Sequence, residues 1–226
     1  MTVALFKSDT DIQQDVLKEL KWDPRVDPSE VGVQVDQGVV TLTGTIGSYA
    51  KKIAAQEAAH RVAGVLDVAN DLTVKLPSVS ERSDQDIAHA VRAALEWDAF
   101  VPDARIRSTV SQGWVTLEGE VEHWSQRLDA ERAVDRLTGV KGIDNRITVR
   151  PTIKADAAKI RKGIEDALDR QAEREAKRID VQVRDGVVTL TGEVRSWAEK
   201  HAVHNAANFA LGVRRVDDRM TVNAYS

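Results

Sequence analysis

The chain has 226 residues, no cysteine and a formal net charge of −4. Without cysteine it has no disulfide framework and no thiolate nucleophile or metal ligand, and the negative charge argues against a general nucleic-acid-binding protein. The first ten residues show no basic start followed by an apolar run, and no stretch reaches the ~20 apolar residues of a membrane span. We therefore expect a soluble, cytoplasmic protein.

One seven-residue stretch occurs three times and sets the organisation of the chain. Its copies are Gly38-Val-Val-Thr-Leu-Thr-Gly44, Gly113-Trp-Val-Thr-Leu-Glu-Gly119 and Gly186-Val-Val-Thr-Leu-Thr-Gly192. Their first glycines lie 113 − 38 = 75 and 186 − 113 = 73 residues apart. A fixed period of this size predicts a tandem array of small domains. We place them at residues 1–77, 78–150 and 151–226, and call them repeats 1, 2 and 3.

Each repeat is predicted to open with an amphipathic helix. Apolar residues spaced by four mark its buried face: Ile12, Val16 and Leu20, then Ile87, Val91 and Leu95, then Ile160, Ile164 and Leu168. In repeat 1 we expect Asp9 or Thr10 to be the N-cap. In repeat 2 we expect Ser83, with Asp86 in capping-box position. The first helix must end near Trp22, because Pro24 disfavours helical geometry in the residue before it.

A β-hairpin follows in each repeat. The first glycine of the repeated stretch (Gly38, Gly113 or Gly186) supplies the positive φ that a tight hairpin turn requires. Apolar residues then alternate along the second strand, as in Val40, Leu42 and Ile46. The second glycine (Gly44, Gly119 or Gly192) lies inside this alternation, which predicts a bulge or a place where a helix packs close.

A second helix starts near Ser48, Trp124 or Ser196, and its inner face is rich in alanine. We expect it to end at a C′ glycine: Gly64, Gly139 or Gly212. The last strand follows a helix, so it can pair parallel to a hairpin strand. The predicted fold is α+β, with three tandem small α-β-β-α-β domains, each a small mixed sheet with both helices on one face.

The tail of each repeat completes a recognisable pattern. After the glycine turn, V-T-L-x-G and a helix come Gly64-Val65 and Asn70-Asp-Leu-Thr-Val74, and repeat 2 has Asn145-Arg-Ile-Thr-Val149. Repeat 3 has Asp218-Arg-Met-Thr-Val222, with aspartate in place of asparagine. This pattern resembles the BON domain family of OsmY-like proteins. The resemblance implies a non-enzymatic domain that attaches to phospholipid membranes and is linked to envelope or osmotic stress.

An aromatic residue opens the second helix of each repeat and a cation follows three residues later. The pairs are Tyr49 and Lys52, Trp124 and Arg127, and Trp197 and Lys200. An amphipathic ring beside a cation suits an interfacial contact with lipid phosphate. The alternative, which we favour, is that the ring covers the edge of a small core, because tryptophan is usually largely buried.

Other aromatic and basic residues are also candidate contacts. Trp22 and Trp97 close the first helix of repeats 1 and 2, where we favour a packing or interface role over a ligand groove. Trp114 is expected on the outer sheet face. Arg214 and Arg215 could bind lipid phosphate, although interleaved acidic residues favour a solvated face. Repeat 3 carries 14 basic and 12 acidic side chains, whereas repeats 1 and 2 each have a net charge of −3.

The sequence predicts no enzyme, cofactor or metal, because it has no nucleophile elbow, P-loop or dinucleotide fingerprint. Our first hypothesis is a stress-related protein that binds anionic phospholipid surfaces or envelope-associated partners, peripheral to the membrane. The second is a protein-interaction, self-assembling or holdase-like module, including a homo-oligomer, since each small sheet exposes a strand edge. The third is sensing of a small ligand or ion. No nucleic-acid partner is expected.

Overall fold

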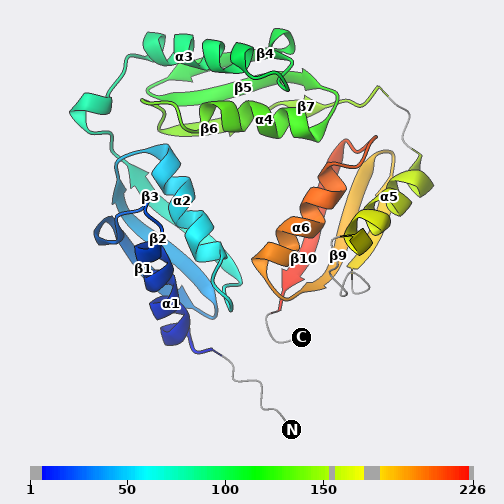
Figure 1. The fold of residues 1–226 in the computed structure, drawn as a ribbon, viewed down its shortest axis with the longest axis horizontal. Coiled ribbons are helices and arrows are strands. Elements are labelled where there is room, and N and C mark those ends of the chain that lie inside the picture. The colour runs from blue at the N-terminus through cyan, green and yellow to red at the C-terminus, as the bar shows by residue number, and fades with distance from the viewer. Residues whose placement is uncertain (1–6, 153–155, 171–178, 224–226) are drawn as a thin grey trace. The chain divides into compact units, whose positions relative to one another are not determined.

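The computed structural model describes residues 7–152, 156–170 and 179–223, and it shows three small sheets, each with two helices (Figure 1). Repeat 1 consists of α1 (Asp9–Trp22), a 3-10 turn η1 (Pro28–Glu30), β1 (Val31–Asp36), β2 (Val39–Ile46), α2 (Tyr49–His60) and β3 (Asp67–Val74). Repeat 2 consists of α3 (Asp84–Trp97), β4 (Ile106–Ser111), β5 (Trp114–Val121), α4 (Trp124–Val134), β6 (Gly142–Asn145) and β7 (Thr148–Val149). Repeat 3 consists of α5 (Ala157–Arg170), β8 (Ile179–Arg184), β9 (Val187–Val194), α6 (Trp197–Asn208) and β10 (Arg215–Val222).

The mixed sheet is confirmed. In repeat 1 the order is β1-β2-β3, with β1 antiparallel and β3 parallel to the central β2. Repeat 3 has the order β8-β9-β10, and in repeat 2 both β6 and β7 pair parallel to β5. The hairpin turn joins two antiparallel strands. The last strand can pair in parallel because the second helix provides the crossover connection that a parallel strand needs.

The core of each repeat lies on one face of the central strand. Val40, Leu42 and Ile46 are 0% exposed, and α1 covers them with Val16 and Leu20. The second helix contributes small side chains to the same core: Ala54, Ala55, Ala58 and Ala59, all buried. Alanine allows the α2 backbone to lie close to the sheet. Both helices therefore pack on the same face of the sheet as the core, and the other face stays open.

The first helix has a different cap from the expected one. Ser8, not Asp9 or Thr10, is the N-cap of α1, because its Oγ accepts from the amide of Asp11 at 3.2 Å and its own amide donates to the Asp11 carboxylate. Repeat 2 has the predicted capping box of Ser83 and Asp86. The prediction for repeat 1 was wrong because several adjacent residues there are good caps by type.

The expectation of C′ glycines was also wrong. Helix α2 ends at His60, with Arg61 as its C-cap, so Gly64 lies beyond the C′ position. A further turn follows, closed by the bond from the Val65 amide to the Val62 carbonyl at 3.3 Å. Gly64 is the third residue of that turn and has φ +98°, as a type II turn demands. Gly139 and Gly212 occupy the same place, before Val140 and Val213.

The glycine inside the second strand meets backbone and not an α-helix. Gly44 has φ +129°, and a Cβ atom there would collide with the carbonyl oxygen of Glu30, at the end of η1. Gly119 meets the Arg105 carbonyl in the same way. The repeated second glycine therefore lets the segment before the first strand cross close to the central strand.

We predict that Gly44→Ala destabilises repeat 1 by about 3 kcal/mol, since it combines an unfavourable φ with a backbone clash. Native-state hydrogen exchange of the β2 amides would measure the loss. Thr45→Ala, at the exposed neighbouring position, is the control and should change the opening free energy of β2 little. Equal exchange in both variants would contradict this account.

Candidate functional site

The cation at the start of each second helix is bound inside its own repeat. Lys52 Nζ donates to the Leu72 carbonyl at 2.7 Å, and Lys200 Nζ donates to the Met220 carbonyl at 2.8 Å. Arg127 donates to the carbonyl of Asn145. In all three repeats the cation therefore joins the second helix to the last strand.

The aromatic residues of this group are partly buried. The Arg127 guanidinium lies 4.8 Å from the centre of the Trp124 ring, and Lys200 Nζ lies 5.0 Å from that of Trp197. A cation over a ring face is attracted by the quadrupole of the ring. These pairs are therefore satisfied within the fold, which leaves each cation with fewer free donors for a lipid phosphate.

The asparagine of the tail pattern ties the same two elements together. Asn70 Nδ2 donates to the Lys52 carbonyl and to Gln56 Oε1, both at 3.1 Å. Asn145 repeats this with the Arg127 carbonyl at 3.1 Å and Glu131 Oε2 at 2.9 Å. A carboxylate has no donor for either contact, so Asp218 of repeat 3 cannot reproduce this bond.

A second tie joins the first helix to the hairpin turn. Asp9 Oδ2 and Oδ1 accept from the backbone amides of Gln37 and Gly38, both at 2.9 Å. Asp84 accepts from Gln112 and Gly113 at 2.7 and 2.8 Å. Sequence reasoning missed this role, although an aspartate 29 residues before the turn glycine in two repeats is a visible signal.

The position of these aspartates in repeat 3 is Ala157, which has no acceptor side chain. The constant spacing of 73 residues between repeats 2 and 3 places it there, since 84 + 73 = 157. The amides of Asp185 and Gly186 correspond to those of Gln112 and Gly113. Repeat 3 therefore lacks the carboxylate that holds the turn in the other two repeats.

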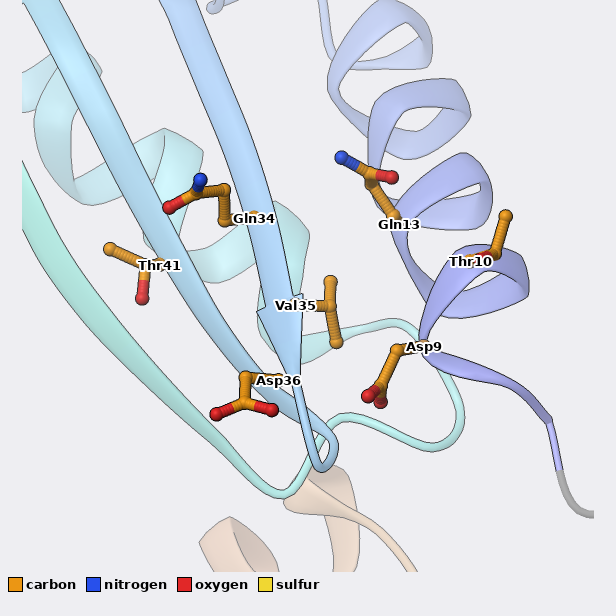
Figure 2. A pocket seen from close by; sticks show the side chains of 7 residues that line it. All are labelled: Asp9, Thr10, Gln13, Gln34, Val35, Asp36 and Thr41. Atoms are coloured by element: carbon orange, nitrogen blue, oxygen red, sulfur yellow. The ribbon is translucent and has the colours of Figure 1, made fainter.

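A pocket of about 360 Å³ lies beside Asp9 in repeat 1 (Figure 2). Its lining residues are Asp9, Thr10, Gln13, Gln34, Val35, Asp36 and Thr41. Figure 2 shows the Asp9 carboxylate directed toward the end of the hairpin, and Gln13 Nε2 donates to the Val33 carbonyl at 2.7 Å. Two of its polar groups thus serve the fold, and small-ligand sensing stays a prediction.

The most buried carboxylate among the described residues is also structural. Asp23, 5% exposed, follows α1 and accepts from Arg25 Nη2 at 2.7 Å and from Arg61 Nη2 at 2.9 Å. Hydrogen bonds from Arg25 and then from Arg61 hold the pKa of Asp23 well below its usual range. A carboxylate kept ionised in this way joins the end of α1 to α2, and it is poorly suited to proton transfer near neutral pH.

Two tryptophans at the ends of the first helices point into solvent. Trp22 is 83% and Trp97 92% exposed, and Phe100 beside Trp97 is also exposed. Local packing, one of the two roles considered for them, is therefore wrong. Trp114 lies on the open sheet face as expected, over Gly142 of the neighbouring strand, where a larger residue would collide with its ring.

Basic residues gather at the hairpin turn of repeat 3. The amides of Arg214 and Arg215 face the Gly186 carbonyl, at 2.7 and 3.4 Å, and Arg184 precedes the turn. All three side chains are exposed. None of them forms an ion pair with another residue that the structure describes. We call Arg184, Asp185, Gly186, Arg214 and Arg215 the basic turn of repeat 3.

In the described ranges, no three metal-ligating side chains come together, and no helix is long and apolar enough to cross a membrane.

Comparison with known proteins gives one family. The model of the BON domain matches residues 8–75, 83–151 and 156–224. Osmotically-inducible protein Y of Escherichia coli K12 is 31% identical over 147 residues, which cover 63% of this chain and 73% of that protein.

Two solved structures of CdsD, a structural protein of the type III secretion system of Chlamydia trachomatis, also align. They are 14% and 13% identical and cover 93% and 96% of this chain, and 91% and 100% of theirs. Their TM-scores are 0.24 and 0.25, too low to support a conclusion.

We predict that Asn70→Asp lowers the stability of repeat 1 by about 2 kcal/mol, because it removes two hydrogen bonds and places a carboxylate against two oxygen atoms. The opening free energy of β3 amides in hydrogen exchange would report the change. Asp71→Asn alters the exposed neighbour and is the control. If the two variants exchange alike, the tie between α2 and β3 contributes nothing measurable.

Proposed function

This chain belongs to the BON domain family, and we propose that it is a non-enzymatic, stress-related protein that attaches to the surface of anionic phospholipid membranes. The link to osmotic stress rests on its similarity to osmotically-inducible protein Y. The membrane role rests on one observation, the basic turn of repeat 3. A cytoplasmic location stays a prediction, which cell fractionation would test.

The basic turn reverses the charge that repeat 1 has at the same place. Arg184 corresponds to Asp36, and Arg215 corresponds to Asp67. Arg214 corresponds to Leu66. Because the hairpin turn and the start of the last strand meet at one end of the domain, these changes turn an acidic end into a basic one. Basic residues near an anionic leaflet contribute about 1 kcal/mol each.

We predict that the chain sediments with vesicles containing anionic phospholipid and not with neutral vesicles, and that salt weakens the binding. The triple variant Arg184→Glu, Arg214→Glu and Arg215→Glu should lose about 100-fold in affinity, because three attractive charges become repulsive. Equal and negligible sedimentation with both kinds of vesicle would rule out the proposal.

A matched variant separates local charge from net charge. Arg107→Glu, Arg132→Glu and Arg136→Glu make the same change in net charge at exposed positions of repeat 2. This variant should keep most of the binding. If it loses as much as the first, the attraction is a general charge effect and the basic turn has no special part in it.

A second candidate function is protein interaction or self-assembly, which the exposure of Trp22 and Trp97 favours. Contiguous exposed apolar patches mark interaction sites on proteins, and the exposed Trp97 has the exposed ring of Phe100 three residues away in the sequence. Acidic neighbours of Trp97, namely Glu96 and Asp98, make this site a better surface for a protein than for an anionic membrane.

We predict that the chain forms oligomers that resist salt, and that Trp22→Ala with Trp97→Ala shifts them to monomers in light scattering. Val79→Ala, which shortens another side chain with high exposure (85%), should leave the oligomers unchanged. A strict monomer at high concentration, with no partner retained on the immobilised chain, would exclude this function.

A further inference from the structure

The three hairpin turns provide an internal comparison. In repeats 1 and 2 a carboxylate from the first helical residue accepts two consecutive amides of the turn, at distances between 2.7 and 2.9 Å. Two adjacent amides that point to one place form an anion-binding concavity. In these two repeats the chain supplies its own anion, so the concavity is filled from within.

In repeat 3 the residue that corresponds to this aspartate has no side chain that can accept from the same two amides. Ala157 stands where Asp9 and Asp84 stand, and the side chain of Asp156 is used to cap α5 through the amides of Ala158 and Lys159. Within residues 156–170 and 179–223, no side chain accepts from the amides of Asp185 and Gly186. The turn is otherwise preserved, with φ +50° at Asp185 and +77° at Gly186.

The surroundings of the turn carry positive charge. A Cβ atom on Gly186 would lie 3.0 Å from Cγ and Cδ of Arg214, so the stem of this arginine covers the turn glycine. Arg184 and Arg215 flank it. Asp185 is exposed and acidic, and opposes them in part, and Lys159 pairs with Asp156 at 3.6 Å. The basic turn itself keeps a net charge of +2 from its three arginines and one aspartate.

We propose that the basic turn of repeat 3 binds one oxyanion group, of the phosphate or carboxylate class, at the amides of Asp185 and Gly186. The anion takes the place that the aspartate carboxylate fills in repeats 1 and 2, and Arg214 adds a charged donor beside it. Hydrogen bonds to an ionised acceptor are stronger than neutral ones, which favours an anion over a neutral ligand. The oxyanion has two possible sources, the phosphate of a lipid headgroup and free phosphate. The inference rests on the proposed function only where the source is a lipid headgroup.

The test is a titration of the full ¹⁵N-labelled chain with inorganic phosphate and, separately, with acetate. The amide resonances of Asp185 and Gly186 should shift and saturate, whereas those of Gln37, Gly38, Gln112 and Gly113 should stay in place. Absence of a saturable shift at Asp185 and Gly186 with either anion would overturn the inference.

The decisive variant is Ala157→Asp, which installs the internal carboxylate of the other repeats. An acidic residue in the first turn of a helix is favourable, so the variant should fold. It should weaken phosphate binding about tenfold or more, by competition within the chain. An unchanged affinity would contradict the proposed site. Arg214→Gln keeps the amides free and should weaken binding by a smaller factor.

Asp9→Ala provides the converse. It frees the amides of Gln37 and Gly38, but Asp36 and Asp67 lie at the positions of Arg184 and Arg215. No phosphate shift is expected in repeat 1 of this variant. A shift as strong as that of repeat 3 would show that the arginines are not needed and would overturn their part in the site.

Binding of the unmodified chain and of Ala157→Asp to anionic vesicles identifies the source of the anion. If Ala157→Asp loses both phosphate and anionic vesicles, the ligand is the headgroup phosphate. If the unmodified chain binds phosphate and ignores vesicles, the oxyanion site stands and the proposed membrane function fails. If vesicles bind equally to both proteins while phosphate binding differs, the membrane function stands and free phosphate is the ligand.

Discussion

Each repeat depends on a small apolar core that is built on one face of its central strand. The central strand contributes Val40, Leu42 and Ile46, all with no exposure, and two helices must cover them within about 70 residues. A domain of this size buries a smaller share of its surface than a larger domain does and is marginally stable on apolar packing alone. The alanine face of α2 follows from this constraint, since a larger side chain would lift the helix from the sheet.

The polar ties follow from the same constraint. Asn70 and Lys52 join α2 to β3, and Asp9 joins α1 to the hairpin turn, through hydrogen bonds that add to the apolar packing of these segments. They lie at the edges of the domain, where charged hydrogen bonds are partly screened by water and contribute about 1 kcal/mol each. Repeats 1 and 2 both have these hydrogen bonds, so the residues that form them stabilise the common fold. Functional differences therefore have to be sought where the repeats differ in sequence.

The elements of this fold were predictable because their signals are local. Spacing of four, alternation and turn glycines gave the helices, the hairpin and the mixed sheet. Most contacts between distant segments gave no such signal, and the aspartate repeated 29 residues before the turn glycine is an exception. Gly44 was expected to mark a bulge or a closely packed helix, and it meets the Glu30 carbonyl. Gly64 was expected to cap α2, and it lies in a later turn. Residue type alone could not tell that Lys52 would reach the Leu72 carbonyl or that Trp22 would be exposed, since both depend on where another segment ends.

Repeat 3 lacks the carboxylate of Asp9 at Ala157 and the amide donor of Asn70 at Asp218, and it has Arg184, Arg214 and Arg215 around the turn that Asp9 binds in repeat 1. A loss of two stabilising contacts in one copy is costly for a small domain unless something else replaces them. A ligand that binds the folded state stabilises it in proportion to the logarithm of its concentration over its dissociation constant. An anion at the basic turn therefore restores, from outside, the interaction that repeats 1 and 2 make for themselves. Repeat 3 is then the copy whose stability responds to the environment, and the other two hold their turns whether or not a ligand is present.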